Sequence, residues 1–159
     1  MSAPLKANTA KSAELQIMIW FLEAGWEVFT PTHDANATDM VVRHPQRREF
    51  LGIQVKHKQP GSKNEGQLAN RWNDGNAPFD ILVFFQPAKT RGLILPRWKL
   101  KKEGKGLVFF ALDKEGYSTG AVRSTFRPFA FDFGIVAHSE RALQFANLLA
   151  EVLAIPVPT

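Results

Sequence analysis

One short segment carries residues whose types and spacing suit metal-assisted phosphate chemistry. Asp39, Gln54 and Lys56 lie on two apolar runs that flank a polar stretch at 45–48. This pattern predicts two strands joined by a turn. With that stretch as the loop, Asp39 faces Gln54, and Lys56 follows on the same face two residues later. An acid, an amide oxygen and an ammonium group on one face suit a divalent cation and a phosphate.

The elements that position these residues form an alternating pattern of helices and strands. A helix is predicted over 12–24, ended by Gly25, with its apolar stripe at Leu15, Met18, Ile19 and Leu22. Further strands are predicted at 26–30, 79–85, 93–95 and 107–112, and further helices at 62–74 and 139–153. The Phe-rich stretch 117–135 is assigned only loose extended structure. The order predicts an α/β fold with a mixed central sheet flanked by helices.

Length and composition indicate a single domain of an ordinary globular kind. The 159 residues are 45% hydrophobic and 22% charged. We expect a core over about 12–112 and a C-terminal extension with a helix over about 113–159. No apolar run has the length of a membrane span, and 1–8 reads as a loose leader without signal-peptide character, so a cytoplasmic location is expected. The absence of cysteine excludes disulfides, thiolate zinc sites and a cysteine nucleophile.

Positive charge gathers around the segment that carries the candidate residues. The formal net charge is +5, and two basic clusters lie in or just after that segment. A solvated basic face is the alternative, but this distribution favours a nucleic acid as partner. The residues expected to contact its backbone are Arg47, Arg48, Lys58, Lys63, Lys99, Lys101, Lys102 and Lys105, with His57 beside Lys56 as a further candidate.

An acidic residue at the start of one strand, then an amide or carboxylate and a lysine at alternate positions of the next, resembles the PD-(D/E)XK nuclease superfamily. The resemblance covers about 12–96 and is carried by Glu14, Asp39 and the run Gln54-Val-Lys56. Within the superfamily, the run Gly25-Trp-Glu-Val-Phe-Thr-Pro, with Asp39 and Gln54-Val-Lys56 after it, is most similar to the homing endonucleases of group I introns. Holliday-junction resolvases of the archaeal type share the layout. The resemblance implies a restriction-endonuclease-like core and a Mg²⁺-dependent, site-specific DNA endonuclease.

The resemblance also implies a role for each residue. Hydrolysis of a phosphodiester needs an activated water and neutralised charge on the phosphate, and Mg²⁺ supplies both through oxygen ligands. Asp39 is the implied direct ligand, with the Gln54 side-chain oxygen and the Val55 carbonyl as further ligands. Lys56 is expected to orient the water or stabilise developing charge. Glu14 is expected to reach the metal through water or to help position Lys56.

Some features depart from the family pattern and leave alternatives open. Thr38 stands where the family has proline, and Gln54 stands where most members have Glu or Asp, although some intron endonucleases also use glutamine. The alternative functions are a junction resolvase or repair nuclease, a catalytically inactive DNA-binding module, and a protein-interaction domain with no nucleic-acid role. The candidate residues could also be ordinary turn and edge-strand residues with no site. Cutting both strands at one site needs two active sites, so a homo-oligomer is expected, with the last helix and 126–133 as its candidate contact.

Overall fold

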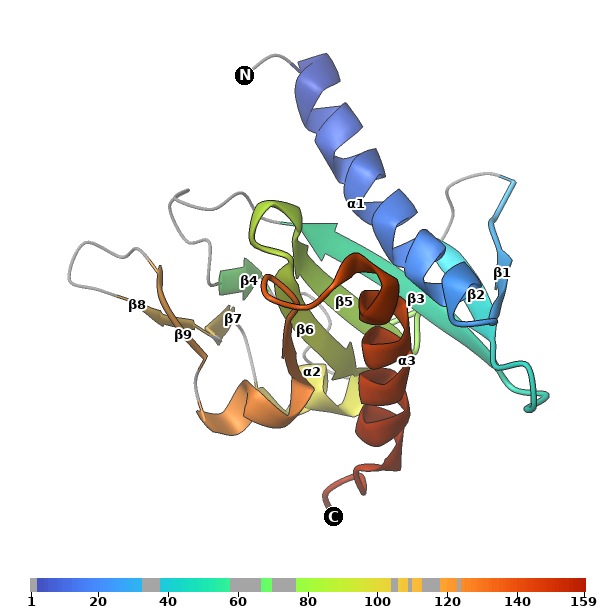
Figure 1. Ribbon diagram of the computed structural model, residues 1–159. Coiled ribbons are helices and arrows are strands. Elements are labelled where there is room, and N and C mark those ends of the chain that lie inside the picture. Colours follow the sequence, from blue (N-terminus) through green and yellow to red (C-terminus); the bar gives the residue numbers. More distant parts are fainter. Residues whose placement is uncertain are drawn as a thin grey trace.

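The computed structural model describes residues 3–32, 38–57, 67–69, 77–103, 106–108, 110–112, 118–122 and 124–159 (Figure 1). The helices are α1 (Ala3–Glu23), α2 (Arg97–Glu103) and α3 (His138–Ala154), with 3₁₀ turns η1 (Pro87–Lys89) and η2 (Ser124–Phe129). The main sheet contains β1 (Glu27–Phe29), β2 (Met40–Arg43), β3 (Phe50–His57), β5 (Ile81–Gln86), β6 (Arg91–Pro96) and β10 (Ala130–Asp132). Two small sheets pair β4 (Gln67–Ala69) with β7 (Gly106–Val108) and β8 (Phe110–Leu112) with β9 (Ser118–Val122).

The six-stranded sheet mixes parallel and antiparallel neighbours, as the sequence predicts. Its strand order is β1-β2-β3-β5-β6-β10. Strands β3 and β5 are parallel, and each other neighbouring pair is antiparallel. A meander followed by a parallel strand requires a crossover connection between β3 and β5. The predicted class, a mixed sheet flanked by helices, is therefore confirmed. None of the helices in the described ranges is long and apolar enough to span a membrane.

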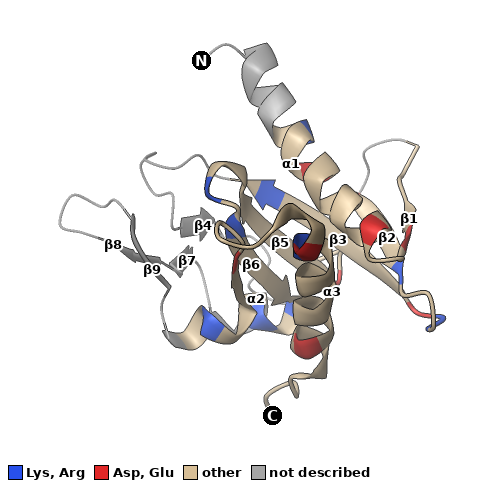
Figure 2. Cartoon of the chain, in the orientation of Figure 1, with Lys and Arg blue, Asp and Glu red and all other residues tan. Residues whose placement is uncertain are grey.

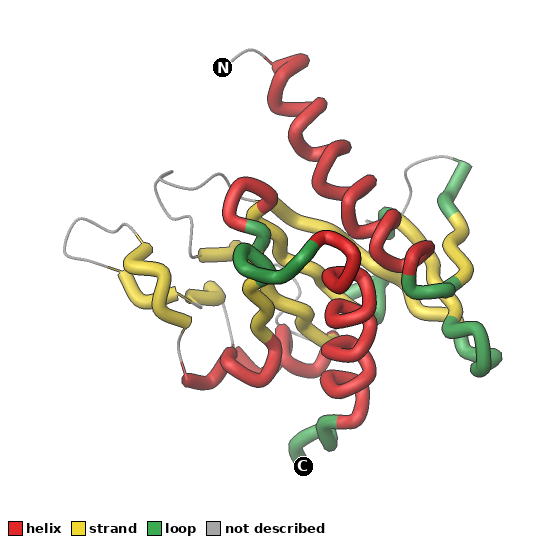
Figure 3. Tube along the Cα trace, viewed as in Figure 1, coloured by secondary structure: helices red, strands yellow, loops and turns green. Residues whose placement is uncertain are grey.

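The register of the β2–β3 hairpin is the predicted one. Val41 pairs with Gly52 and Met40 pairs with Ile53, which places the centre of symmetry in the predicted turn. The connecting loop runs over 44–49 and is drawn green in Figure 3. It is longer than the predicted loop by one residue at each end, so the pairing of the strands is unchanged. The hairpin therefore carries the candidate residues at its open end.

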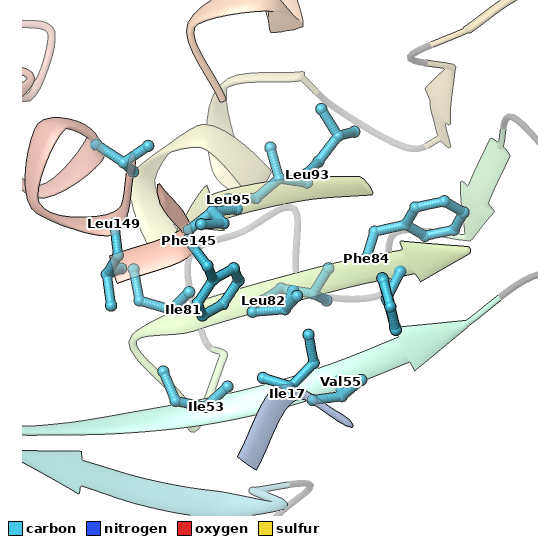
Figure 4. Packing of buried hydrophobic residues seen from close by; sticks show 14 of the residues in the cluster. Ile17, Ile53, Val55, Ile81, Leu82, Phe84, Leu93, Leu95, Phe145 and Leu149 are labelled. Carbon is cyan, nitrogen blue, oxygen red and sulfur yellow. The ribbon is translucent and has the colours of Figure 1, made fainter. Parts of the chain in front are cut away.

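One part of the hydrophobic core lies between the sheet and the two long helices. Helix α1 contacts β1, β3 and α3, and α3 contacts β6. Trp20 stands at the centre of an aromatic cluster, with ring centroids 5.3 to 6.0 Å from those of Phe85, Phe131, Phe133 and Phe145. Figure 4 shows Ile17 and Phe145 of the helices facing residues of β3 and β5. This packing fixes α1 against the strand that carries Gln54 and Lys56.

The sequence prediction chose the wrong face of the first helix. Over 10–23, where the side chains of α1 are described, the buried ones are Ala13, Ile17, Trp20 and Phe21. Three of the four residues of the expected stripe are instead exposed, namely Leu15, Ile19 and Leu22. Both faces are apolar, so periodicity alone does not select between them, and the large aromatic rings decide the packing. The helix also begins at Ala3, so the loose leader expected over 1–8 is wrong for 3–8, whereas the predicted stop at Gly25 is confirmed by its φ of 86°.

Other elements differ from the predictions in the second half of the chain. The helix expected over 62–74 is wrong at Gln67–Ala69, which form β4, and the rest of that segment lies outside the described residues. The second basic cluster begins in a helix, α2, that the sequence did not predict. The Phe-rich stretch forms β9, η2 and β10, and its side chains Phe126, Phe129, Phe131 and Phe133 are all buried. These rings are therefore core residues and are not available for the expected subunit contact.

Gly92 offers a test of the close packing of β5, β6 and β10. A Cβ added there would lie 2.0 Å from the Phe84 carbonyl oxygen and 2.8 Å from the Phe131 ring. We expect Gly92→Ala to lower the free energy of unfolding by about 3 kcal/mol or more, because backbone must move to relieve the clash. The matched control is Gly52→Ala, whose Cβ would meet its nearest atoms at 3.5 Å. Equal denaturant midpoints for the two variants would contradict this packing.

Candidate active site

Asp39 lies directly before β2, where the chain leaves the regular pairing. The regular strand pairs of the hairpin end at Met40 and Ile53, and the Asp39 backbone N–H donates to the Ile53 carbonyl at 2.9 Å. Its carboxylate accepts a hydrogen bond of 2.7 Å from the backbone N–H of Val55. Charge-assisted bonds of this kind are short and strong. This bond holds the Asp39 carboxylate beside the backbone of Val55, which lies between Gln54 and Lys56.

Gln54 is buried, and its side-chain oxygen has no partner among the residues that the structure describes. The residue is 5% exposed, and Oε1 has no hydrogen-bond partner in the described structure. An unsatisfied buried amide costs about 1–3 kcal/mol, so its presence calls for an explanation such as a bound water or ion. A cation ligated by this oxygen would satisfy it. The orphaned atom therefore fits the ligand role that the resemblance implies for Gln54.

The Val55 carbonyl is directed to the same edge of β3 as the Asp39 carboxylate. In a strand, the N–H and C=O of one residue point to the same side, and the Val55 N–H points to Asp39. Carboxylate, amide and carbonyl oxygens are the ligands that Mg²⁺ and Ca²⁺ prefer. Within the described ranges, no three His, Cys, Asp or Glu side chains are grouped to hold a metal. A cation at this position would therefore depend on Gln54 and Val55 as well as on Asp39.

Lys56 shares a face of β3 with Gln54, because the two lie two residues apart on one strand. It is partly exposed and sits opposite Phe84 of the parallel strand β5. His57 is the next residue, so its side chain points to the other face of the sheet. Lys56 and His57 are thus not directed to one phosphate, and the expected role of His57 has no support from this geometry.

A pocket of about 360 Å³ joins the first helix to the start of β2. Its lining contains both expected carboxylates, Glu14 of α1 and Asp39, as the resemblance implies. Glu14 also forms an ion pair with Lys11, with 3.5 Å between Nζ and Oε2. Gln54 and Lys56 are not part of this lining. The rest of the lining consists of residues that sequence reasoning missed, since they come from separate segments: Lys11, Thr30, Pro31, Thr32 and Thr38.

Asp80 fixes the position of β3 next to the site. Its carboxylate accepts a 2.8 Å bond from the Gly52 N–H, and its own N–H donates to the Gly52 carbonyl at 2.9 Å. Arg97 holds the other carboxylate oxygen at 3.2 Å and donates to the Phe79 carbonyl at 2.9 Å. This network ties β3 to the start of β5 and the end of β6. Asp80 therefore supports the strand on which the candidate ligands lie.

The basic residues expected to contact DNA fall into different environments. Arg47 and Arg48 are exposed in the β2–β3 loop. Lys99 is 7% exposed, and its ammonium group lies 4.9 Å and 5.4 Å from the ring centroids of Phe126 and Phe129. Because its ammonium group is buried over these rings, Lys99 is not accessible to a DNA phosphate, and the prediction that it contacts DNA is corrected. Lys58, Lys63 and Lys105 lie outside the described residues, as do the side chains of Lys101 and Lys102.

Comparison with solved structures identifies the fold. The chain resembles the bacterial homing endonuclease I-Ssp6803I, with a TM-score of 0.53 and 22% sequence identity. The match covers 72% of this chain and 82% of that one. The chain has a restriction-endonuclease-like fold. No protein-family model and no curated protein matches the sequence.

The restriction-endonuclease-like fold is the fold that the resemblance implies. Helix α1 places Glu14 in one pocket with Asp39. The Asp39 carboxylate also accepts a hydrogen bond from the backbone N–H of Val55, which lies between Gln54 and Lys56. The parallel strand β5 supports β3 from its other side.

Proposed function

We propose that the protein is a divalent-metal-dependent DNA endonuclease that hydrolyses phosphodiester bonds, with a site-specific activity of the homing or restriction type. The observation that carries the proposal is the Asp39 carboxylate, which accepts a 2.7 Å hydrogen bond from the Val55 N–H, next to Gln54, whose buried side-chain oxygen has no partner in the described part of the chain. The similar solved structure is that of a homing endonuclease, which supports this proposal. The basic surface around the β2–β3 loop suits a polyanionic substrate.

Each residue has a role that follows from its position. Asp39, the Gln54 oxygen and the Val55 carbonyl would hold Mg²⁺. When bound, Mg²⁺ supplies an activated water and polarises a phosphoryl oxygen. Lys56 presents an ammonium group on the same face and would orient the water or stabilise developing charge on the phosphate. Glu14 shares a pocket with Asp39 and would hold a water there or help position Lys56.

A plasmid assay tests the proposal. We expect supercoiled DNA to be nicked or linearised by the protein with Mg²⁺ and left intact when EDTA removes the metal. Salt-dependent DNA binding without any Mg²⁺-dependent cleavage would contradict the endonuclease and indicate an inactive binding module. Preferential cleavage of a four-way junction over duplexes would indicate a resolvase, whereas one cut in a long duplex would support the site-specific activity.

Site-specific cleavage of both strands also requires two active sites at the DNA. We therefore propose that the protein acts as a homo-oligomer, a dimer or larger. The mass in solution, measured at the concentration of the cleavage assay with and without DNA, checks this. A monomeric mass in both conditions, together with double-strand cutting, would contradict it.

Whether Gln54 acts as a metal ligand distinguishes an active nuclease site from an inactivated one. We expect Gln54→Leu, which removes the amide oxygen at similar size, to raise the Mg²⁺ concentration for half-maximal cleavage by about 10-fold or more. Its free energy of unfolding should be equal or higher, because an unsatisfied buried group is lost. The control Gln54→Glu keeps an oxygen and should need no more Mg²⁺ than the wild type. A Leu variant with unchanged Mg²⁺ dependence would show that Gln54 is not a ligand.

A further inference from the structure

The β2–β3 loop forms a second basic site, remote from the candidate catalytic end. A pocket of about 530 Å³ is lined there by Arg43, Arg47, Arg48, Glu27, Gly25, Pro45 and Gln46. Figure 1 shows the loop projecting away from the helices, and Figure 2 shows basic residues at its tip. Arginine side chains bind phosphate groups through two parallel hydrogen bonds, so they suit a nucleic-acid backbone.

The loop is held in one conformation by contacts that do not use the side chains of its exposed arginines. The His44 ring accepts a 3.0 Å bond from the Gln46 N–H, and the His44 carbonyl accepts one of 3.1 Å from the Arg47 N–H. The same ring packs edge-on against Trp26, with centroids 5.0 Å apart. A preorganised backbone lowers the entropy lost when the loop binds a ligand.

Three arginines lie in or next to the loop: Arg43 at the end of β2 is engaged in contacts within the protein, whereas Arg47 and Arg48 are exposed. Arg43 forms an ion pair with Glu27, and its guanidinium lies 5.1 Å from the centroid of the Phe50 ring. Arg47 and Arg48 are exposed at the tip. Glu27 is therefore engaged by Arg43, and the tip presents Arg47 and Arg48 to the solvent beside the exposed Glu49.

The length of β3 sets the separation between the loop and the catalytic end. From Phe50 to Lys56 the strand advances six residues, which is about 20 Å at the usual rise of about 3.3 Å per residue. Arg47 and Arg48 lie beyond Phe50. Successive phosphates of one DNA strand are about 3.4 Å apart along the helix axis. A separation of about 20 Å or more therefore corresponds to about six base pairs or more.

We propose that Arg47 and Arg48 bind backbone phosphates of the DNA substrate about six base pairs or more from the scissile phosphate, with the duplex running along the β2–β3 hairpin. This inference rests on the proposed endonuclease function and adds to it a second phosphate site and a minimum length of bound duplex. A substrate too short to reach the loop would lose these contacts.

Measurement of the salt slope tests the loop without any catalysis. The binding constant for a random-sequence duplex that spans both sites is measured at several salt concentrations without a divalent metal. The slope of log K against log salt is negative, and each lost phosphate contact reduces its magnitude by about 0.9, so the magnitude should be about 1.8 smaller for the double variant Arg47→Ala/Arg48→Ala. The matched control Arg127→Ala removes an exposed arginine of η2 and should leave the slope unchanged. An unchanged slope in the double variant would overturn the proposal.

Tethered cleavage tests the distance. Because the chain has no cysteine, Gln46→Cys places one thiol in the loop for an iron–EDTA probe, and Ile135→Cys, fully exposed, is the control. With Ca²⁺ holding the uncut complex, we expect probe-induced breaks about six base pairs or more from the cut that the protein itself makes with Mg²⁺. Breaks nearer to that cut, or the same pattern from the control, would overturn the proposal. If the protein itself made no cut, the proposed endonuclease function would be refuted. The salt slope would still test whether Arg47 and Arg48 bind phosphates.

Discussion

Asp39→Asn is expected to reduce Mg²⁺-dependent DNA cleavage by about 10³-fold or more, because a carboxylate ligand is replaced by a neutral amide. Metal stabilisation of the transition state is worth several kcal/mol, and each 1.4 kcal/mol is about a factor of ten in rate. The asparagine oxygen can still accept the hydrogen bond from the Val55 N–H that the carboxylate accepts at 2.7 Å. The variant therefore removes charge and retains the local structure.

The measurement is the single-turnover rate of plasmid cleavage, with DNA affinity in Ca²⁺ and thermal unfolding measured beside it. Asp132→Asn is a matched control, since the Asp132 carboxylate also accepts a backbone hydrogen bond, of 3.1 Å from Gly134, in an exposed turn. The control should cleave at the wild-type rate. Equal rates for the wild type and Asp39→Asn would show that the Asp39 carboxylate takes no part in catalysis.

Lys56→Met is expected to lower the cleavage rate by about 10²–10³-fold while DNA affinity in Ca²⁺ stays near the wild-type value. Removal of one group that stabilises developing charge typically has an effect of this size. Methionine keeps much of the aliphatic stem against the sheet, so the loss reports on the ammonium group. Lys56→Arg should recover only part of the rate, because the guanidinium is larger and planar.

The same substitution at a distant cation is the control for Lys56. Arg127→Met removes one exposed positive charge from η2 and should leave the rate unchanged. If Lys56→Met lowered only DNA affinity, and the rate at saturating protein were unchanged, Lys56 would be a binding residue and not a catalytic one.

The hairpin was predictable from the sequence because its signal is local. A polar turn between two apolar runs sets the register, and Val41 opposite Gly52 follows from it. What the register does not give is the end of the pairing, where the Asp39 N–H bonds to Ile53 and its carboxylate to Val55. These two hydrogen bonds depend on the path of the chain just before β2, and the residue types in the segment do not determine that path.

Features that depend on distant segments were not predictable in this way. Helix α1 is apolar on two sides, so only the aromatic cluster around Trp20 selects the buried one. Lys11 and Thr30 become site residues because α1 and the segment after β1 line one pocket. The burial of Lys99 likewise requires η2, a segment that the sequence described only as Phe-rich.

The most direct test of the central claim is a crystal structure of the protein with a DNA duplex and Ca²⁺. We predict a cation at calcium–oxygen bonding distance, about 2.3–2.6 Å, from the Asp39 carboxylate, the Gln54 side-chain oxygen and the Val55 carbonyl, shared with a backbone phosphate. The Lys56 ammonium group should lie on the same side. A duplex bound elsewhere, or a phosphate at this edge with Gln54 turned away and no cation present, would contradict the account.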